Sequence, residues 1–268
     1  MRHALFVPPF DGLAEPDRLV ELAVAAESSG WDGLFLWDHL LYSAPVRDVL
    51  DPYVSLGAIA AATSRLVIGP MVTPLARRRP AVLARQALSV ERLSRGRLVL
   101  GLGLGDDAGP AGEFSSFGDE SDPAVRAAML DEGLGVLAGL LSGETVRHSG
   151  PHYVVRDVAL RPAPERTGGI PLWLAARWPH RRPLRRAARH DGVVVIQMDD
   201  PADLVPLRDE LARAGADLAT FDVVVQRTPG DDASRWAAGG VTWLMTRVGP
   251  YRIDVDEAMS LARCGPRR

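Results

Sequence analysis

An apolar run that ends on a carboxylate and an imidazole is the first stretch of this sequence with the means to do chemistry. Residues 33–36 are glycine, leucine, phenylalanine and leucine, and Trp37, Asp38 and His39 follow directly. A buried strand has no use for Asp38 and His39 at its end, because both need hydrogen-bond partners that a dry core lacks. At the carboxyl end of a barrel strand they would point into the mouth, where active sites lie. The alternative is a strand that runs into an ordinary polar loop.

Two other apolar runs carry features that suit a bound ligand. One has glycine at every second position from 101 to 105, which either lets a backbone approach a flat ligand or relieves crowding at a barrel rim. It lacks the G-x-G-x-x-G spacing of a dinucleotide site. The other, residues 65–73, contains Pro70. Proline cannot donate to a strand ladder, so we expect a bulge at Pro70 unless the strand ends at Ile68.

A basic loop in the second half of the chain could hold an anion. Ala175 and Ala176 end an apolar run, and Arg177, Trp178 and Pro179 follow, with two more arginines at 181 and 182. Backbone amides at the start of a helix favour an anion, and the arginines add positive charge. The alternative is a solvated basic helix face.

Composition limits the classes of function. The 268 residues carry a net charge of −3 and no basic cluster interleaved with aromatics, which argues against a nucleic-acid partner. All 31 basic residues are arginines, which excludes Schiff-base lysine chemistry and a phosphate-loop lysine. The histidines and acids show no local metal-ligand spacing, so we expect no metal. The single cysteine, Cys264, fits a reducing compartment. With no signal-peptide core and no run of ~18 apolar residues, we expect a cytoplasmic protein without membrane contact.

The positioning elements alternate along the whole chain. Strands are expected at residues 3–8, 33–37, 65–73, 97–103, 170–176, 193–196, 221–226 and 241–245. Helices are expected at residues 15–29, 51–62, 81–93, 122–141, 183–190, 201–214, 234–238 and 255–263. Strict alternation predicts parallel strands with right-handed crossovers. Eight such units favour an α/β fold, a single (β/α)8 TIM barrel over residues 1–268, rather than an open doubly wound sheet. Residues 142–165 read as a small hairpin before the fifth strand.

Six groups of residues carry a more specific signal: Gly30-x-Asp32-Gly33 with Trp37-Asp38-His39; Arg65-Leu66-Val67-Ile68-Gly69 with Val72-Thr73-Pro74 and Pro80; Leu93-Ser94-Arg95-Gly96-Arg97 with Gly101-Leu102-Gly103; Ile170-Pro171-Leu172-Trp173; Ala187-Ala188-Arg189 with Asp191-Gly192; and Gly240-Val241-Thr242-Trp243. Together they resemble the bacterial luciferase-like flavin oxidoreductases and monooxygenases. The resemblance runs over nearly the whole chain and is most specific in its first hundred residues.

The resemblance implies a barrel that holds reduced FMN or the deazaflavin coenzyme F420 at its C-terminal mouth. It implies that His39, held by Asp38 or a neighbour, acts as general base or proton donor in hydride transfer, or assists monooxygenation in an FMN enzyme. Glu113, in the long acidic loop at 104–122, is the third catalytic candidate. A cis peptide is expected between Pro70 and Met71. The cofactor-binding candidates are Asp38, Pro70, Met71, Val72, Thr73, Gly103, Ala175, Ala176, Arg177 and Trp178.

One departure from the family matters for the cofactor. Relatives have glycines after the fifth strand for the cofactor phosphate, where this chain has Ala176, Arg177, Trp178 and Pro179. Arg177 could replace the amide donors by a charge-assisted contact. Alternatively, Trp178 fills the pocket and leaves a non-catalytic barrel that acts as a flavin-binding or interaction module. The Asp-His pair, where many FMN members have Glu-His, favours the deazaflavin. The expected partners are a small-molecule substrate, a separate flavin or F420 reductase and a second copy in a homodimer.

Overall fold

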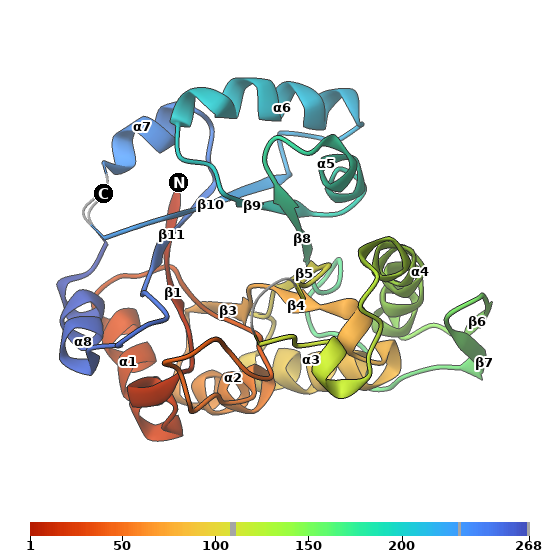
Figure 1. Ribbon diagram of the computed structural model, residues 1–268, viewed down its shortest axis with the longest axis horizontal. Helices are drawn as coiled ribbons and strands as arrows, with labels where there is room; N and C mark the ends of the chain where they lie inside the picture. The colour runs from red at the N-terminus through yellow and green to blue at the C-terminus, as the bar shows by residue number, and fades with distance from the viewer. Residues whose placement is uncertain (108–110, 230–231, 267–268) are drawn as a thin grey trace.

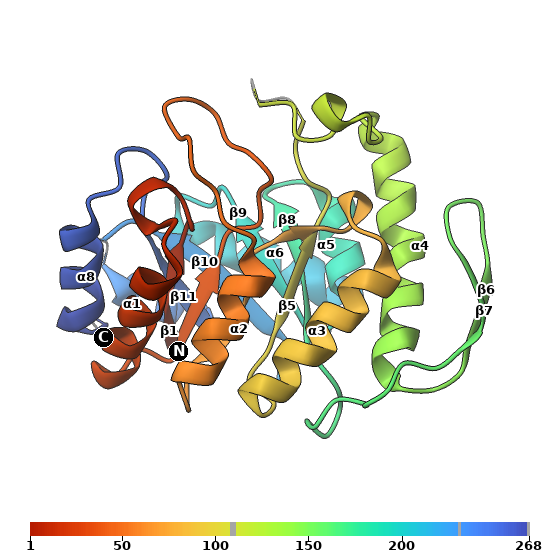
Figure 2. The same cartoon turned by 90° about the horizontal axis from the view of Figure 1, so that it is seen from below.

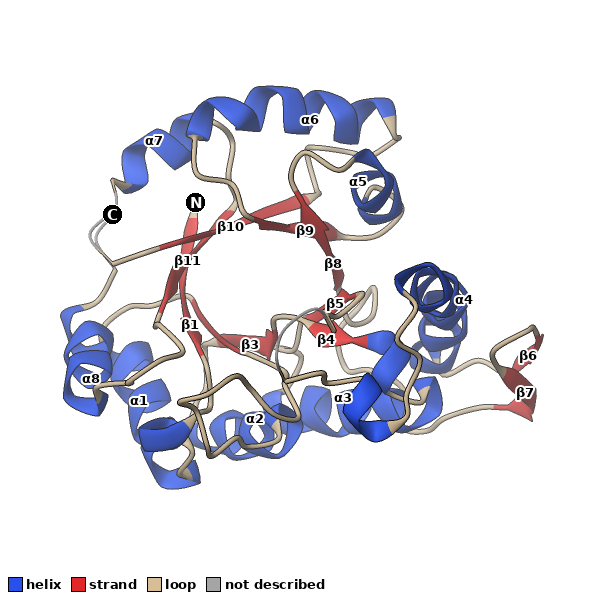
Figure 3. Ribbon diagram, viewed as in Figure 1, coloured by secondary structure: helices blue, strands red, loops and turns tan. Residues whose placement is uncertain are grey.

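The strands of this protein form a closed parallel barrel. The computed structural model describes residues 1–107, 111–229 and 232–266. Its main sheet has the order β3-β2-β1-β11-β10-β9-β8-β5-β4, and the ring that the strands form is seen end-on in Figure 3. The strands are β1 (Arg2–Val7), β2 (Gly33–Leu36), β3 (Val67–Pro70), β4 (Thr73–Pro74), β5 (Leu100–Gly103), β8 (Leu172–Arg177), β9 (Gly192–Ile196), β10 (Asp222–Arg227) and β11 (Trp243–Arg247). A parallel bridge between Ile68 and Leu98 closes the ring.

Helices follow the strands and cover the outside of the barrel (Figure 1). They are α1 (Pro16–Ser28), α2 (Pro52–Ala62), α3 (Pro80–Ser94), α4 (Pro123–Ser142), α5 (Arg181–Ala187), α6 (Leu204–Arg213), α7 (Ala233–Ala238) and α8 (Val255–Cys264), with 3-10 turns η1 (Asp11–Leu13), η2 (Leu75–Arg77), η3 (Ser115–Phe117) and η4 (Pro201–Asp203). The predicted (β/α)8 barrel is therefore confirmed.

Local sequence signals explain where two of these helices begin. The Asp51 carboxylate accepts hydrogen bonds from Tyr53 N and Val54 N at the start of α2, and Asp122 does the same at the start of α4. Each cap precedes a proline at the first helical position, where the missing N–H has no helical partner to lose. Within the described ranges, no helix is long and apolar enough to cross a lipid bilayer.

The predicted hairpin stands apart from the barrel. Strands β6 (Val146–Ser149) and β7 (Val154–Val158) pair antiparallel between α4 and β8, and the hairpin projects beyond α4 in Figures 1 and 2. Figure 2 also shows that the long loops after β2 and β5 rise on the same side of the barrel as the C-terminal ends of the strands. Residues 108–110, in the loop expected at 104–122, lie outside the described residues.

Three aromatic rings fill the barrel interior. Phe35, Trp173 and Trp243 lie edge to face with all three centroid separations at 5.6 Å. Glycine makes room for both indoles, because a Cβ on Gly33 would meet Trp243 at 3.0 Å and one on Gly192 would meet Trp173 at 2.6 Å. The interior is thus a packed floor rather than a pore.

The third barrel strand is split into β3 and β4 by the predicted bulge. The cis peptide joins Met71 to Val72, one residue later than the expected bond between Pro70 and Met71, which is trans. A Cβ on Gly103 would lie 2.7 Å from Val72, and one on Gly101 would collide with the Pro70 carbonyl oxygen. The alternating glycines of β5 therefore relieve crowding against the bulge, the second of the two interpretations that the sequence allowed.

Candidate functional site

A cavity of about 620 Å³ occupies the C-terminal mouth of the barrel. Seven of the candidate residues line it: Asp38, His39, Met71, Val72, Glu113, Ala175 and Arg177. Five others do not: Pro70, Thr73, Gly103, Ala176 and Trp178. A second cavity of about 650 Å³ lies beside α8 and the loop after β11. Its described lining contains no histidine, so the mouth cavity is the candidate site.

His39 and Glu113 form the pair in this cavity with the clearest chemical potential. Nδ1 of His39 lies 2.6 Å from Oε2 of Glu113. An ionised carboxylate can only accept hydrogen bonds, so Nδ1 of His39 carries the proton and donates a hydrogen bond to Glu113. In the neutral imidazole, Nε2 then holds the free lone pair. That arrangement is a general base whose tautomer is fixed by a carboxylate.

Glu113 is held as an anion although it is only 6% exposed. Burial alone would raise the pKa of its carboxyl. The hydrogen bond and charge of His39, the charge of Arg77 and the backbone N–H of Leu40 outweigh burial, and the pKa lies below its usual value. Arg77 Nη1 donates to Oε1 over 2.8 Å, and Leu40 N donates to the same oxygen over 2.7 Å.

Asp38 makes no hydrogen bond to the His39 ring, and its carboxylate instead holds residues behind the His39–Glu113 pair. Its side chain is fully buried. Its Oδ1 accepts from Arg77 Nη2 at 2.6 Å and from Arg78 Nη2 at 2.9 Å, and its Oδ2 accepts from Thr73 Oγ1 at 2.6 Å. Of the two sequence alternatives for the partner of His39, the structure therefore has a neighbour, Glu113, rather than Asp38.

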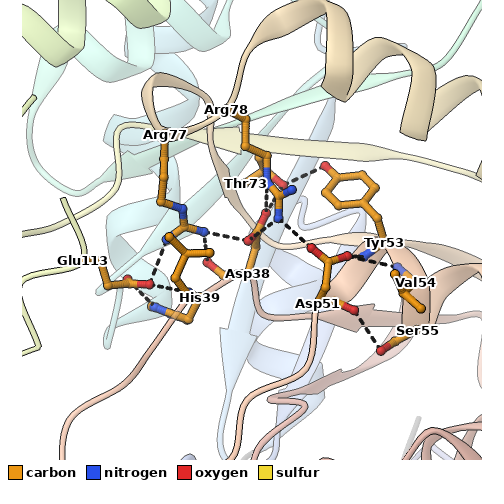
Figure 4. Close-up of polar contacts among 11 residues, drawn as sticks. Asp38, His39, Asp51, Tyr53, Val54, Ser55, Thr73, Arg77, Arg78 and Glu113 are labelled. Carbon is orange, nitrogen blue, oxygen red and sulfur yellow. Dashed lines mark hydrogen bonds and ion pairs between the residues drawn. The ribbon is translucent and has the colours of Figure 1, made fainter. Parts of the chain in front are cut away.

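A chain of contacts leads from Asp38 through Arg77 and Glu113 to His39 (Figure 4). Arg77 bridges the carboxylates of Asp38 and Glu113, and its own side chain is 2% exposed. Five side chains here each contact a side chain of the opposite acid–base character. We call them the paired cluster: Asp38, His39, Arg77, Arg78 and Glu113.

A second layer of hydroxyls supports Asp38. Because Thr73 gives its only hydroxyl proton to Asp38, the 2.8 Å contact between Thr73 Oγ1 and Tyr53 OH has Tyr53 as donor. Burial and the nearby charge of Asp38 raise the pKa of Tyr53, which keeps that donor protonated. Thr73 thus acts on the site from behind Asp38 and not from the cavity wall.

Aromatic rings pack against His39. The imidazole lies edge to face with Tyr42, with ring centroids 4.9 Å apart, and the Trp37 ring lies 5.9 Å away. Burial and the neighbouring Tyr251 raise the pKa of Tyr42 to about 12, so its hydroxyl stays protonated near neutral pH. Of these two rings, Trp37 lines the cavity and Tyr42 does not, so Trp37 gives the cavity wall next to His39 an apolar surface that suits a small-molecule site.

The loop after β8 resolves the departure noted in the sequence. Trp178 is partly buried and packs against the core between the barrel and its helices, and its backbone N–H donates to Ile196 O over 3.2 Å. It does not fill the mouth. Ala176 is buried in the same core, whereas Ala175 and the exposed Arg177 line the cavity together with His180.

Arg126 lines the same side of the cavity. It lies in the first turn of α4, is 4% exposed, and its guanidinium carbon sits 4.3 Å from the centroid of the Phe114 ring. Its Nε and Nη1 are buried without a hydrogen-bond partner. We call Arg126, Arg177 and His180 the cationic rim.

Sequence reasoning missed Arg77, Arg78 and Arg126. A signal for the first two was present: three consecutive arginines, 77 to 79, begin three residues after Pro74 at the strand end. Arg126 had no such signal, because it reads as one more polar position in a helix. Across the ranges that the structure describes, no three histidine, cysteine or acidic side chains are grouped as a metal site.

Solved structures share this fold at low sequence identity. An F420-dependent secondary alcohol dehydrogenase, in complex with an F420-acetone adduct, superposes with a TM-score of 0.80 at 18% identity over 98% of this chain and 97% of that one. A monooxygenase from Streptomyces bottropensis gives a TM-score of 0.77 at 18% identity, with the same shares covered.

Curated relatives are closer in sequence. An F420-dependent glucose-6-phosphate dehydrogenase from Nakamurella multipartita is 29% identical over 92% of this chain and 74% of its own length. One from Microbacterium testaceum is 30% identical over 79% of this chain, and the match spans 63% of that protein. Residues 1–239 match the model of a protein family that is described as luciferase-like monooxygenase. The chain therefore belongs to the luciferase-like monooxygenase family.

Proposed function

We propose that this protein is a deazaflavin F420-dependent oxidoreductase that interconverts an alcohol and a carbonyl group on a small organic substrate. The His39–Glu113 pair at the mouth carries this proposal, because alcohol oxidation needs a base beside the reacting carbon. The names of the two relatives above, both F420-dependent dehydrogenases, support the choice of cofactor and reaction.

The residues at the mouth fit a flat cofactor with an anionic tail. The cavity volume of about 620 Å³ falls within the range of about 300–1,000 Å³ usual for ligand sites. Its wall offers apolar surface from Met71 and Val72 for a ring. On the other side, the buried nitrogens of Arg126 have no protein acceptor. Met71, Val72 and Ala175 would hold the ring system, and Arg177 would contact the tail.

The reaction divides between the cofactor and the protein. When bound, a deazaflavin accepts or supplies the hydride. Nε2 of His39 takes the hydroxyl proton as the substrate carbon becomes a carbonyl carbon, and returns it in the reverse direction. Glu113 fixes the tautomer and stabilises the imidazolium that forms. Arg77, itself held by Asp38, keeps Glu113 ionised and in place.

Two alternatives are outcomes of the same test. FMN is the second cofactor candidate, since a type II Baeyer-Villiger monooxygenase in complex with FMN shares the fold with a TM-score of 0.67. A non-catalytic barrel is disfavoured because the residue expected to close the mouth, Trp178, packs elsewhere. We also propose a separate reductase and a homodimeric state, as the family resemblance implies.

Titration of the purified protein with F420 and with FMN tests the proposal. We expect micromolar binding of F420, followed by its absorbance and fluorescence, and substrate-dependent reduction of F420 when a panel of secondary alcohols and sugar phosphates is added. Tighter binding of FMN than of F420, together with oxygen consumption, would identify FMN as the cofactor instead. If the protein binds neither cofactor, the enzyme proposal fails and the non-catalytic barrel becomes the better interpretation.

A further inference from the structure

We propose that Tyr251, in the loop after β11, is a positioning residue that holds the imidazole of His39 in its working orientation and acts through Tyr42. The inference deepens the proposed function and rests on it for the reaction that His39 serves. The loop, residues 248–254, lies outside the segment 1–239 that matches the family. Its contribution to the site is therefore a feature of this chain.

A single hydrogen bond does not fix the His39 ring. Nδ1 is held 2.6 Å from Oε2 of Glu113, but one contact at one edge leaves the imidazole able to tilt about that edge. Because Nε2 must face the substrate hydroxyl, a tilt moves the proton acceptor away from the proton. A displacement of about 1 Å at a reacting group can cost on the order of 100-fold in rate. The ring therefore needs packing contacts as well.

Three aromatic rings supply these contacts. The ring centroids of Phe10 and Trp37 each lie 5.9 Å from that of His39. The Tyr42 ring is nearer, at 4.9 Å, with its plane turned by 81°. The barrel fixes the two more distant rings, since Phe10 is fully buried and Trp37 stacks on Phe6 with centroids 5.2 Å apart. Tyr42 makes the closest aromatic contact to the imidazole.

Tyr42 depends on a contact between two loops. It belongs to the loop after β2, where it packs against Phe10 with ring centroids 5.0 Å apart. It also contacts Tyr251, with ring centroids 5.7 Å apart, and this neighbour contributes to the raised pKa of Tyr42. The Tyr42–Tyr251 pair therefore joins the loop after β2 to the loop after β11, and Tyr251 supports the ring that packs on His39.

Tyr251 reaches His39 only through this intermediate ring. It lines the second cavity, beside α8, and is not part of the described lining of the mouth. Among the rings that the structure describes, those in contact with His39 are Phe10, Trp37 and Tyr42. Tyr251 is 50% exposed, so its replacement removes little core packing. It is a positioning residue and not a catalytic one.

The test compares Tyr251→Ala and Tyr251→Phe with the wild type. Alanine removes the ring, whereas phenylalanine keeps the ring and removes only the hydroxyl. Arg252→Asn is the control, because Arg252 is the exposed next residue of the same loop. Its backbone has a φ of 50°, which asparagine tolerates. Turnover and KM are measured with F420 and a confirmed substrate, and urea denaturation gives the midpoint of unfolding.

A second measurement needs no cofactor. In nitrogen-15 spectra at about pH 8, where an ordinary imidazole is neutral, a histidine held in one tautomer gives two widely separated ring-nitrogen signals. Exchange between tautomers brings the two signals together. The signals of His39 are those that are lost in His39→Ala. We expect the full separation in the wild type, Tyr251→Phe and Arg252→Asn, and a reduced separation in Tyr251→Ala.

We expect Tyr251→Ala to lose roughly two- to tenfold in turnover, the range that the loss of one aromatic pair supports. KM and the urea midpoint should stay nearly unchanged, and Tyr251→Phe should keep most of the wild-type rate. Action through Tyr42 adds a further condition. Once Tyr42→Leu has removed the contact to His39, adding Tyr251→Ala should cause no additional loss.

Three results overturn the inference. The first is that Tyr251→Ala has the turnover and the His39 signals of the wild type. The second is that Tyr251→Phe loses as much as Tyr251→Ala, because the ring would then contribute nothing. The third is a parallel loss in Arg252→Asn, or a lowered urea midpoint in Tyr251→Ala, which would make the loop a structural element. If the wild type binds neither F420 nor FMN, the proposed function fails, and the nitrogen signals still decide whether Tyr251 holds His39.

Discussion

On the β2 side of the mouth, acids and arginines alternate in contact, from Asp38 through Arg77 to Glu113 and His39. On the α4 and α5 side, Arg126, Arg177 and His180 line the same cavity, and no ion pair joins them to an acid among the described residues, although Asp107 attracts Arg126 electrostatically. The paired cluster and the cationic rim thus share one cavity and differ in whether ion pairs within the protein hold their charged groups.

That difference separates the tasks of the two sides. A proton-transfer group works best when its geometry and protonation state are fixed before the substrate arrives, and the paired cluster supplies this through buried hydrogen bonds. A binding group works best when its charge is satisfied only by the ligand. The proposed function gives the cationic rim this second task, with the anionic tail of the cofactor as its ligand.

The largest expected effect is on the stability of the paired cluster. Arg77→Met leaves the buried carboxylates of Asp38 and Glu113 without their common partner, and we expect a loss of about 3–5 kcal/mol in unfolding free energy. Urea denaturation measures it. Arg126→Met should show no loss in the same assay, and equal losses in both variants would contradict the comparison between the two sides.

The next effect is on turnover. His39→Ala removes the proton acceptor but little core packing, since the histidine side chain is 28% exposed. We expect turnover to fall by ~100-fold or more, with cofactor affinity and urea midpoint nearly unchanged. His152→Ala, in the loop of the β6-β7 hairpin, is the control. If His39→Ala turns over a confirmed substrate at the wild-type rate, His39 is not the proton acceptor.

A smaller effect is expected at the exposed part of the cationic rim. Arg177→Ala should weaken FMN or F420 binding by about 1 kcal/mol, near fivefold, because solvent screens an exposed charge. Riboflavin should bind wild type and variant equally. A loss for riboflavin as large as that for FMN would mean that Arg177 does not contact the tail.

The smallest effect is a pH dependence of the paired cluster. The pKa of Glu113 is lowered in the folded protein, so its contribution to stability is present above the unfolded pKa of about 4.3 and is lost as the pH falls through the folded value. We expect the wild type to exceed Glu113→Gln in urea midpoint at neutral pH, and the gap to narrow below about pH 4.3. A gap that stays constant into acid would mean that the Glu113 charge does not stabilise the fold.

The fold was predictable because its signals are local. Each barrel strand is a short apolar run, and caps such as Asp51 and Asp122 with a following proline set helix starts within a residue or two. Asp38 and His39, at the polar end of the second strand, also predicted correctly where the mouth of the barrel lies. The bulge was expected from Pro70, but its cis bond falls at Met71–Val72, one residue later than predicted.

The pairing inside the site was not predictable, because it joins residues far apart in the chain. Glu113 is 74 residues from His39, and Arg77 is 39 residues from Asp38. Composition shows that an acid and a base are available, and only the closed barrel shows which of them meet. Arg126 is harder still, since only the fold shows that two of its nitrogens are buried without a hydrogen-bond partner.

The aromatic floor of Phe35, Trp173 and Trp243 has a consequence for proton exchange. Because the rings close the barrel below the site, a proton held by His39 exchanges with bulk water through the mouth. A cofactor and substrate that fill the mouth would isolate that proton during turnover. A proton taken from the substrate hydroxyl would then return to the same oxygen at each reversal within that complex, and would exchange with water only when the mouth opens.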